Sequence, residues 1–126
     1  MKQIVMLTIA SLLSILLQTF HMTSDFLYEK GGMSRSAFVI VVLFLVVWLY
    51  GTLMLSERRS GYIIIFVGSL SAAGMGIVHT VGHAVGKSNG FFFIWTLIAM
   101  GVSGTFSLIL SVLGLWSLRR PVYVLK

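Results

Sequence analysis

Four long apolar segments alternate with short polar segments along this chain. The apolar segments cover about residues 3–24, 37–55, 62–85 and 91–118. Each is close to the length of about 17–25 residues that a transmembrane helix needs. Four segments are too few to close a membrane β-barrel. We therefore predict an all-α membrane protein, a four-transmembrane-helix antiparallel bundle that forms one domain over residues 1–126.

The composition shows which solvent the chain is adapted to. Hydrophobic residues make up 58% of the sequence and charged residues 10%, whereas soluble domains carry about 25% charged residues. We therefore expect the main partner to be the lipid bilayer, with membrane-protein partners or a homo-oligomer also open. The net charge of +6 does not indicate nucleic-acid binding, because the basic residues flank the apolar segments. Cysteine is absent, which excludes disulfides and thiolate metal sites.

The basic residues also predict the orientation. Lys and Arg are enriched in cytoplasmic loops, and a cytoplasmic N-terminus places six of them on the cytoplasmic side and three on the other. We therefore predict both termini in the cytoplasm (N-in, C-in), in a bacterial inner (plasma) membrane. Residues 4–17 resemble the apolar part of a signal peptide, but no small-residue cleavage site follows them, so we expect a retained first span.

Two local features concern the ends of the predicted spans. Residues 25–34 are predicted to be the longest loop, because the Gly-Gly pair at 31–32 interrupts a helix. Ser34 or Ser36 can then cap the second helix. Near the other end of the second span, Trp48 is expected in the headgroup region, where aromatic residues gather.

Small residues recur every four positions along the third span. This stripe consists of Gly68, Ala72, Gly76, Thr80 and Ala84. Because small residues let two membrane helices approach closely, we predict that this face packs against another helix. In the fourth span, serines at 103, 107 and 111 form a second stripe, whose hydroxyls are predicted to bond carbonyls of their own helix or a neighbouring helix.

Three histidines and one carboxylate lie near the ends of the first and third spans. His79 and His83 are four residues apart, and so are His21 and Asp25, so each pair shares one helical face. In an antiparallel bundle these two spans run in the same direction and end at one membrane face. Ionisable groups within a span are costly in lipid and usually face the bundle interior. We therefore predict that the four residues converge near the outer face, toward the periplasm or exterior.

This residue set predicts a metal site. Imidazole nitrogen suits Zn, Cu and Fe, and one carboxylate does not discriminate among them. A zinc ion held by His21, His79 and His83 leaves a fourth position for water. Asp25 is then either a further ligand or the catalytic group that holds this water. The predicted function is a metal-dependent membrane enzyme, a hydrolase or oxidoreductase acting on a lipid or small apolar substrate, although the sequence leaves open whether the protein is an enzyme.

By ligand type, the set resembles the zinc site of the seven-helix intramembrane hydrolases that include alkaline ceramidases. There an HxxxH pair, a third histidine and a water-holding aspartate meet at one membrane face, which would correspond here to His79, His83, His21 and Asp25. The ligand types are also similar to those of the Asp/His/His copper site of particulate methane monooxygenase, with a different residue order. This chain has four predicted spans rather than seven and shares no further motif, so the resemblance implies no family.

Haem b is the main alternative cofactor. One haem takes axial histidines from opposite sides, so His21 would pair with either His79 or His83. The remaining histidine and Asp25 would then have no clear role, which favours a bare metal ion. Two further alternatives are a structural accessory subunit of a larger membrane complex, and a polar patch held by hydrogen bonds or sensitive to protonation.

Overall fold

The computed structural model describes residues 2–28, 34–81 and 91–119 of the chain. It contains four helices, which are α1 (Lys2–Tyr28), α2 (Arg35–Met54), α3 (Arg59–Val81) and α4 (Phe91–Ser117). Each is long and apolar enough to cross a membrane. The prediction of an all-helical chain with four helices long and apolar enough to cross a membrane is therefore confirmed for the described residues.

The helices extend beyond the predicted spans at several ends. Helix α2 begins at Arg35 and α3 at Arg59, two and three residues before the predicted starts, and the largest difference is at the end of α1. Helix α1 does not end at Ser24 but continues to Tyr28, so Asp25 lies in the last part of a helix and not in a loop. No Gly or Pro precedes the Gly-Gly pair at 31–32, so nothing interrupts the helix earlier. The extra turn also places the ring of Phe26 against that of Phe38 on α2, with centroids 4.7 Å apart.

The start of α2 agrees with the sequence. Ser34 is its N-cap, and its hydroxyl accepts a hydrogen bond of 3.2 Å from the backbone amide of Ala37. This bond satisfies one of the amides that the first turn of a helix leaves without a partner. Helix α3 is described to Val81. The last four residues of the predicted third span, 82–85, lie outside the described residues.

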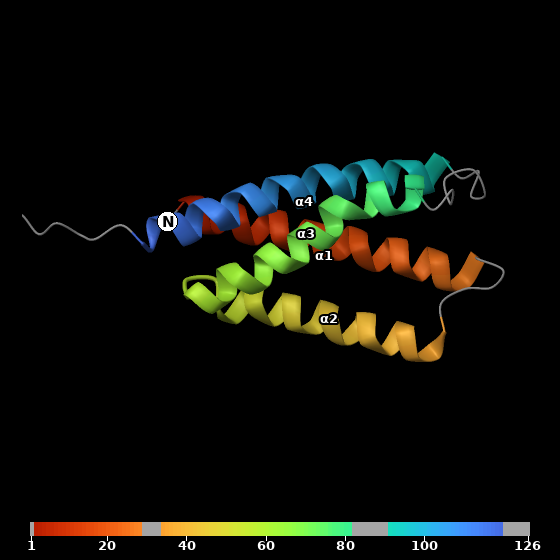
Figure 1. Ribbon diagram of the computed structural model, residues 1–126, viewed down its shortest axis with the longest axis horizontal. Coiled ribbons are helices and arrows are strands. Elements are labelled where there is room, and N and C mark those ends of the chain that lie inside the picture. The colour runs from red at the N-terminus through yellow and green to blue at the C-terminus, as the bar shows by residue number, and fades with distance from the viewer. Residues whose placement is uncertain (1, 29–33, 82–90, 120–126) are drawn as a thin grey trace, which may run out of the picture.

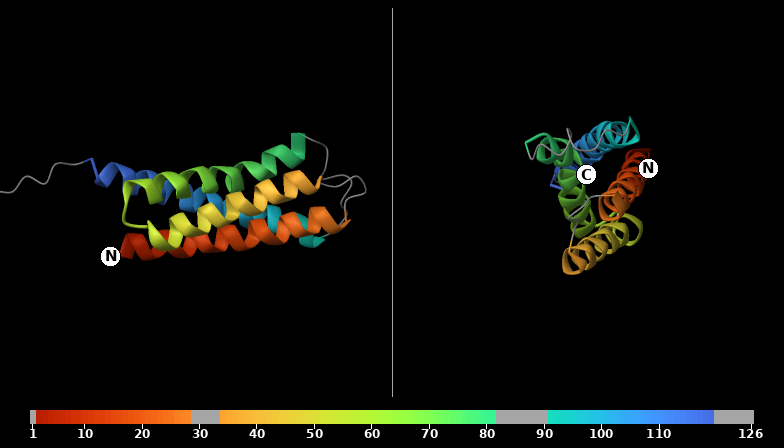
Figure 2. Two further views of the ribbon diagram at one scale, coloured as in Figure 1. Left: turned by 90° about the horizontal axis from the view of Figure 1, so that it is seen from below. Right: turned by 90° about the vertical axis from the view of Figure 1, so that its right-hand side faces the viewer.

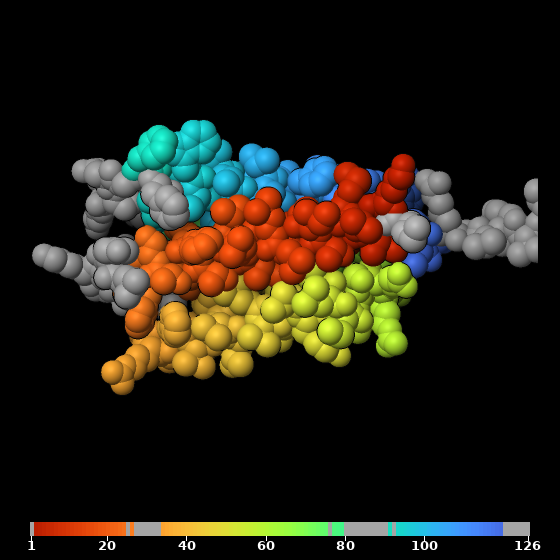
Figure 3. All heavy atoms as spheres, turned by 180° about the vertical axis from the view of Figure 1, so that it is seen from behind, coloured from red at the N-terminus to blue at the C-terminus, as the bar shows by residue number. Residues whose placement is uncertain are grey.

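The helices pack as a bundle in which α3 and α4 share the most extensive contact (Figure 1). Helix α1 packs against α4 on one side and α2 on the other, and Figure 3 shows it lying between them on the rear face. Helix α2 also contacts α3. The end-on view in Figure 2 shows α2 at the edge of the bundle, and it has fewer buried residues than the other three spans.

The interior of the bundle holds many polar side chains, and its surface is apolar. Among the described residues, ten buried side chains are polar and twelve are hydrophobic. The buried polar residues are Ser11, Ser14, Gln18, His21, Thr52, Ser69, Thr96, Ser103, Ser107 and Ser111. Large aliphatic and aromatic side chains cover the outside of every helix. This distribution fits a protein surrounded by lipid, because polar groups there must find partners inside the protein.

The side chain of Trp48 lies inside the bundle. It is 1% exposed, so it does not face outward as an aromatic residue that contacts lipid headgroups would. Its Nε1 donates a hydrogen bond of 2.9 Å to the Ser11 hydroxyl, and its ring packs against Gly68 so closely that a Cβ there would collide with it. An indole is buried readily when its N–H finds an acceptor.

The small-residue stripe of α3 packs against two helices. Gly68 contacts α2 through Trp48, and Ala72 is fully buried against Gly104 of α4. The prediction of a packing face is confirmed at these two positions, while residues 76, 80 and 84 fall outside the described side chains. The serine stripe of α4 is also buried. Its hydroxyls bond Ser14 of α1, Ser69 of α3 and carbonyls of α4.

The close approach of α3 and α4 predicts the effect of adding one methyl group. A Cβ on Gly104 would lie 2.7 Å from the backbone nitrogen of Ala73 and 2.9 Å from the Cβ of Ala72, so the helices would have to move apart. We expect Gly104→Ala to destabilise the protein by about 1–3 kcal/mol, measured as a lower melting temperature in detergent.

Gly101 provides the matched control on the same helix. A Cβ built there meets nothing within 4 Å, so Gly101→Ala should leave the stability unchanged or raise it by up to about 1 kcal/mol through helix propensity. Equal melting temperatures for the two variants would show that α3 and α4 do not touch at Gly104.

Candidate functional site

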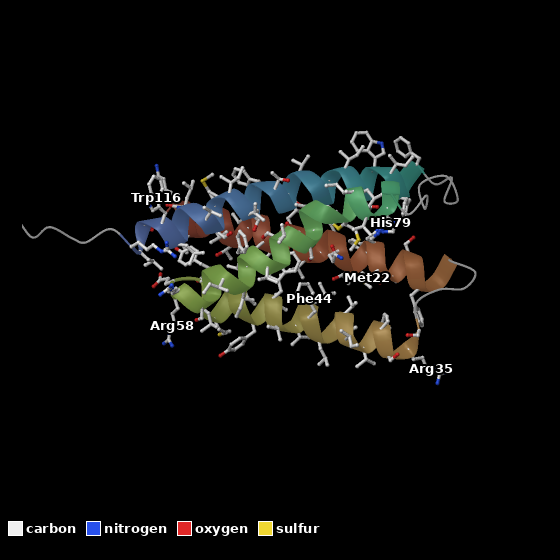
Figure 4. The ribbon with its side chains drawn as sticks, viewed as in Figure 1. Met22, Arg35, Phe44, Arg58, His79 and Trp116 are labelled. Atoms are coloured by element: carbon white, nitrogen blue, oxygen red, sulfur yellow. The ribbon has the colours of Figure 1, made fainter. Side chains whose placement is uncertain are left out.

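His21 of α1 and His79 of α3 meet inside the bundle. Their Nε2 atoms are 2.7 Å apart, and their rings are nearly perpendicular, at 88°. His79 projects from α3 toward α1 (Figure 4). His21 is 1% exposed, while His79 is half-buried. The expectation that these two histidines, 58 positions apart in the sequence, point toward each other is therefore met.

Phe93 at the start of α4 forms an apolar wall beside both histidines. Its ring centroid lies 5.0 Å from that of His21 and 5.4 Å from that of His79. Because Phe93 is itself buried, it keeps water away from this side of the pair. Three helices thus contribute to the site, and the interaction between the imidazoles is stronger in such a low-dielectric environment than in water.

The distance between the two nitrogens restricts the protons that the pair holds. At 2.7 Å one Nε2 must carry a hydrogen and donate it, while the other accepts with its lone pair. Two fully protonated rings would direct two N–H groups at each other, which this contact does not allow. The two Nε2 atoms therefore share one hydrogen between them.

The pair can hold a small metal ion after a modest adjustment. With Zn–N bonds of about 2.0–2.1 Å in a tetrahedral site, two ligand nitrogens lie about 3.3 Å apart. The Nε2 atoms of His21 and His79 would have to separate from 2.7 Å to that value, a change that small side-chain rotations provide. A haem would need its porphyrin plane to pass between these nitrogens, where Phe93 contacts both rings.

The other two predicted ligands are not described as side chains. Asp25 lies on α1 one turn beyond His21, on the same helical face, but its side chain is outside the described atoms, and His83 is outside the described residues. Among the described side chains, no group of three or more His, Cys, Asp or Glu residues is positioned to hold a metal ion. The roles of Asp25 and His83 stay predictions.

A row of polar residues on α1 was missed by the sequence analysis. Ser11, Ser14, Gln18 and His21 are spaced by three, four and three residues, so they lie on one face, and all four are buried. The spacing itself was the available signal. It predicts that α1 turns a polar stripe inward, with His21 as its outermost described member.

The hydroxyls of this row pair with neighbouring helices. Ser11 bonds the Thr52 hydroxyl of α2 at 2.8 Å, and Ser14 donates to the Ser103 hydroxyl of α4 at 3.1 Å. Gln18 differs from them, because its side-chain oxygen Oε1 is buried and has no hydrogen-bond partner among the described atoms. An unsatisfied buried carbonyl is unusual and needs an explanation.

Comparison with known proteins gives no relative from which a function follows. No protein-family model matches the chain, and neither does any curated protein or solved structure. The functional argument therefore depends on the residues of the site and on their positions in the bundle.

The contact between the two imidazoles predicts a coupling between them. We expect the double variant His21→Ala/His79→Ala to lose about 0.5–1.5 kcal/mol less unfolding free energy than the sum of the single variants. The reason is that either single change already breaks the hydrogen bond. Unfolding of all three variants in detergent, followed by circular dichroism, measures this difference.

Ser107→Ala supplies the control for this double-mutant cycle. Ser107 bonds Ser69 and lies fourteen positions along α4 from Phe93, about 20 Å by helical rise. Its effect should add to that of His21→Ala within about 0.5 kcal/mol. If the effects of His21→Ala and His79→Ala on the unfolding free energy are equally additive, the two rings do not interact.

Proposed function

We propose that this protein is a membrane protein that binds a transition-metal ion, with His21 and His79 as two of its ligands. The observation that carries the proposal is the 2.7 Å approach of the two Nε2 atoms from helices far apart in the sequence. Histidine pairs presented by facing helices are a recurring way to build a metal site in a bundle. Neutral imidazole is the preferred ligand of Zn, Cu and Fe.

Asp25 and His83 are proposed to complete the site. Each follows one of the paired histidines by four residues in the sequence. Asp25 lies one helical turn beyond His21 on α1. The described parts of α1 and α3 end at the same end of the bundle (Figure 1). A zinc ion with three histidines would keep a position for water and lower the pKa of that water to about 7. Asp25 would then orient the water for attack on a lipid or small apolar substrate.

We propose that the bundle is antiparallel and has both termini in the cytoplasm. Contacts between α3 and α4 support the first part, because Tyr62, Ser69 and Ala72 meet Gly114, Ser107 and Gly104 in opposite sequence order. The six-to-three distribution of Lys and Arg supports the second part. The site would then lie toward the periplasm or exterior.

The orientation predicts the result of a reporter fusion. A reporter that is active only in the cytoplasm should be active when fused after Lys126 and inactive when inserted between α1 and α2. The six-to-three excess of basic residues on the cytoplasmic side is the physical reason. The reverse pattern would place the histidine pair at the cytoplasmic face and contradict the proposal.

The metal proposal predicts the metal content of the purified protein. Protein extracted in detergent should carry about one Zn, Cu or Fe ion per chain by elemental analysis. His21→Ala, His79→Ala and His83→Ala should each reduce this content strongly, because a site with two remaining protein ligands holds an ion weakly. Asp25→Asn should reduce activity more than metal content if Asp25 orients the water.

Ser107→Ala is again the control, because this buried polar residue lies far from the pair and should leave the metal content unchanged. A Soret absorption band in place of the metal signal would identify haem b as the cofactor. Protein without either signal would mean that the histidine pair is a structural hydrogen bond, as expected for an accessory subunit of a larger complex.

A further inference from the structure

Gln18 is the one residue of the polar row whose chemistry the packing does not explain. Its side chain is 3% exposed, and its Oε1 atom has no hydrogen-bond partner among the described atoms. It precedes His21 by three residues on α1, so the two side chains are neighbours on the helix surface. Gln18 therefore lies directly beside the histidine pair, on the side of the membrane interior.

The nearest polar group further along the row does not satisfy this oxygen. The Ser14 hydroxyl is directed at the Ala10 carbonyl and the Ser103 hydroxyl. In lipid no bulk water reaches the bundle interior, so a buried carbonyl without a donor is destabilising. Met has nearly the shape of Gln and would fill the same space without this penalty. The presence of an amide indicates that a donor belongs opposite Oε1.

The site beside Gln18 supplies such a donor when it holds an ion. Water bound to a divalent metal is a strong hydrogen-bond donor, because the metal withdraws charge from its oxygen. A carbonyl oxygen can only accept, so it fixes the orientation of that water. Groups that bond the ligands of a metal in this way typically change its affinity 10- to 100-fold.

We propose that Gln18 is a positioning residue of the His21–His79 site and that its Oε1 accepts a hydrogen bond from a metal-bound water. This inference rests on the proposed metal function and adds a second hydrogen-bond partner for the water, on the opposite side of His21 from Asp25.

The test compares the zinc affinity of the full-length protein and three variants in detergent, by competition with a chromophoric chelator. Gln18→Met should bind Zn²⁺ about tenfold more weakly, while the melting temperature of the metal-free protein stays the same or rises. Gln18→Glu keeps an acceptor at the same place and should retain at least the original affinity. Ser107→Ala should bind like the unchanged protein.

The outcomes separate this inference from the proposed function. If the unchanged protein binds no Zn²⁺ in a manner that depends on His21 and His79, both are wrong. If it does, and Gln18→Met binds with the same affinity, only the role of Gln18 is wrong. A Gln18→Met variant whose metal-free form also melts at a lower temperature would assign Gln18 to packing and overturn the inference as well.

Discussion

The pairing of polar groups inside a lipid-facing bundle is the constraint on which the rest of the structure depends. Lipid offers no hydrogen bonds, so a hydroxyl, amide or imidazole within a span is destabilising unless it finds a partner in the protein. The hydroxyl pairs Ser14–Ser103 and Ser69–Ser107 connect α4 to α1 and α3. Trp48 and Ser11 connect α2 to α1 in the same way. Each bond fixes the rotation of two helices at once, because a rotated helix would expose its hydroxyls to acyl chains.

This fixed rotation is what turns His79 into the bundle. Ala72 is held against Gly104 by the close contact of α3 with α4, and His79 follows Ala72 by seven residues. Seven residues make nearly two full turns, so both side chains leave the helix in almost the same direction. The same argument applies to α1, where His21 follows the buried Ser14 by seven residues. The contact between His21 and His79 is therefore a consequence of helix contacts that lie one to two turns closer to the middle of the bundle.

The spans and the inward positions of His21 and His79 could be predicted from the sequence, but the orientation of every side chain could not. Apolar length locates a span, and charged or small residues in a span indicate its inner face, which is why the contact between His21 and His79 could be predicted. A span as uniformly apolar as α2 gives no such indication. Trp48 was expected near the headgroups because aromatic residues gather there, and the hydrogen bond that its indole donates to Ser11 does not follow from the sequence of α2. The polar row on α1 was missed because a single serine in a span does not indicate which face is buried. Only the spacing of the serines on one face, in line with His21, indicates a buried polar stripe.

The geometry of the pair also determines what an arriving ion must overcome. In the neutral pair one Nε2 carries a hydrogen, and a metal that binds both Nε2 atoms needs two lone pairs there. The hydrogen can move to Nδ1 of the same ring, which leaves the imidazole neutral and its Nε2 free to bind. Whatever accepts from that Nδ1 then helps to select the tautomer that binds metal. A metal ion at the proposed site would therefore compete with a hydrogen for the same lone pairs. The packing of α1, α3 and α4 holds the two Nε2 atoms close enough to share one hydrogen.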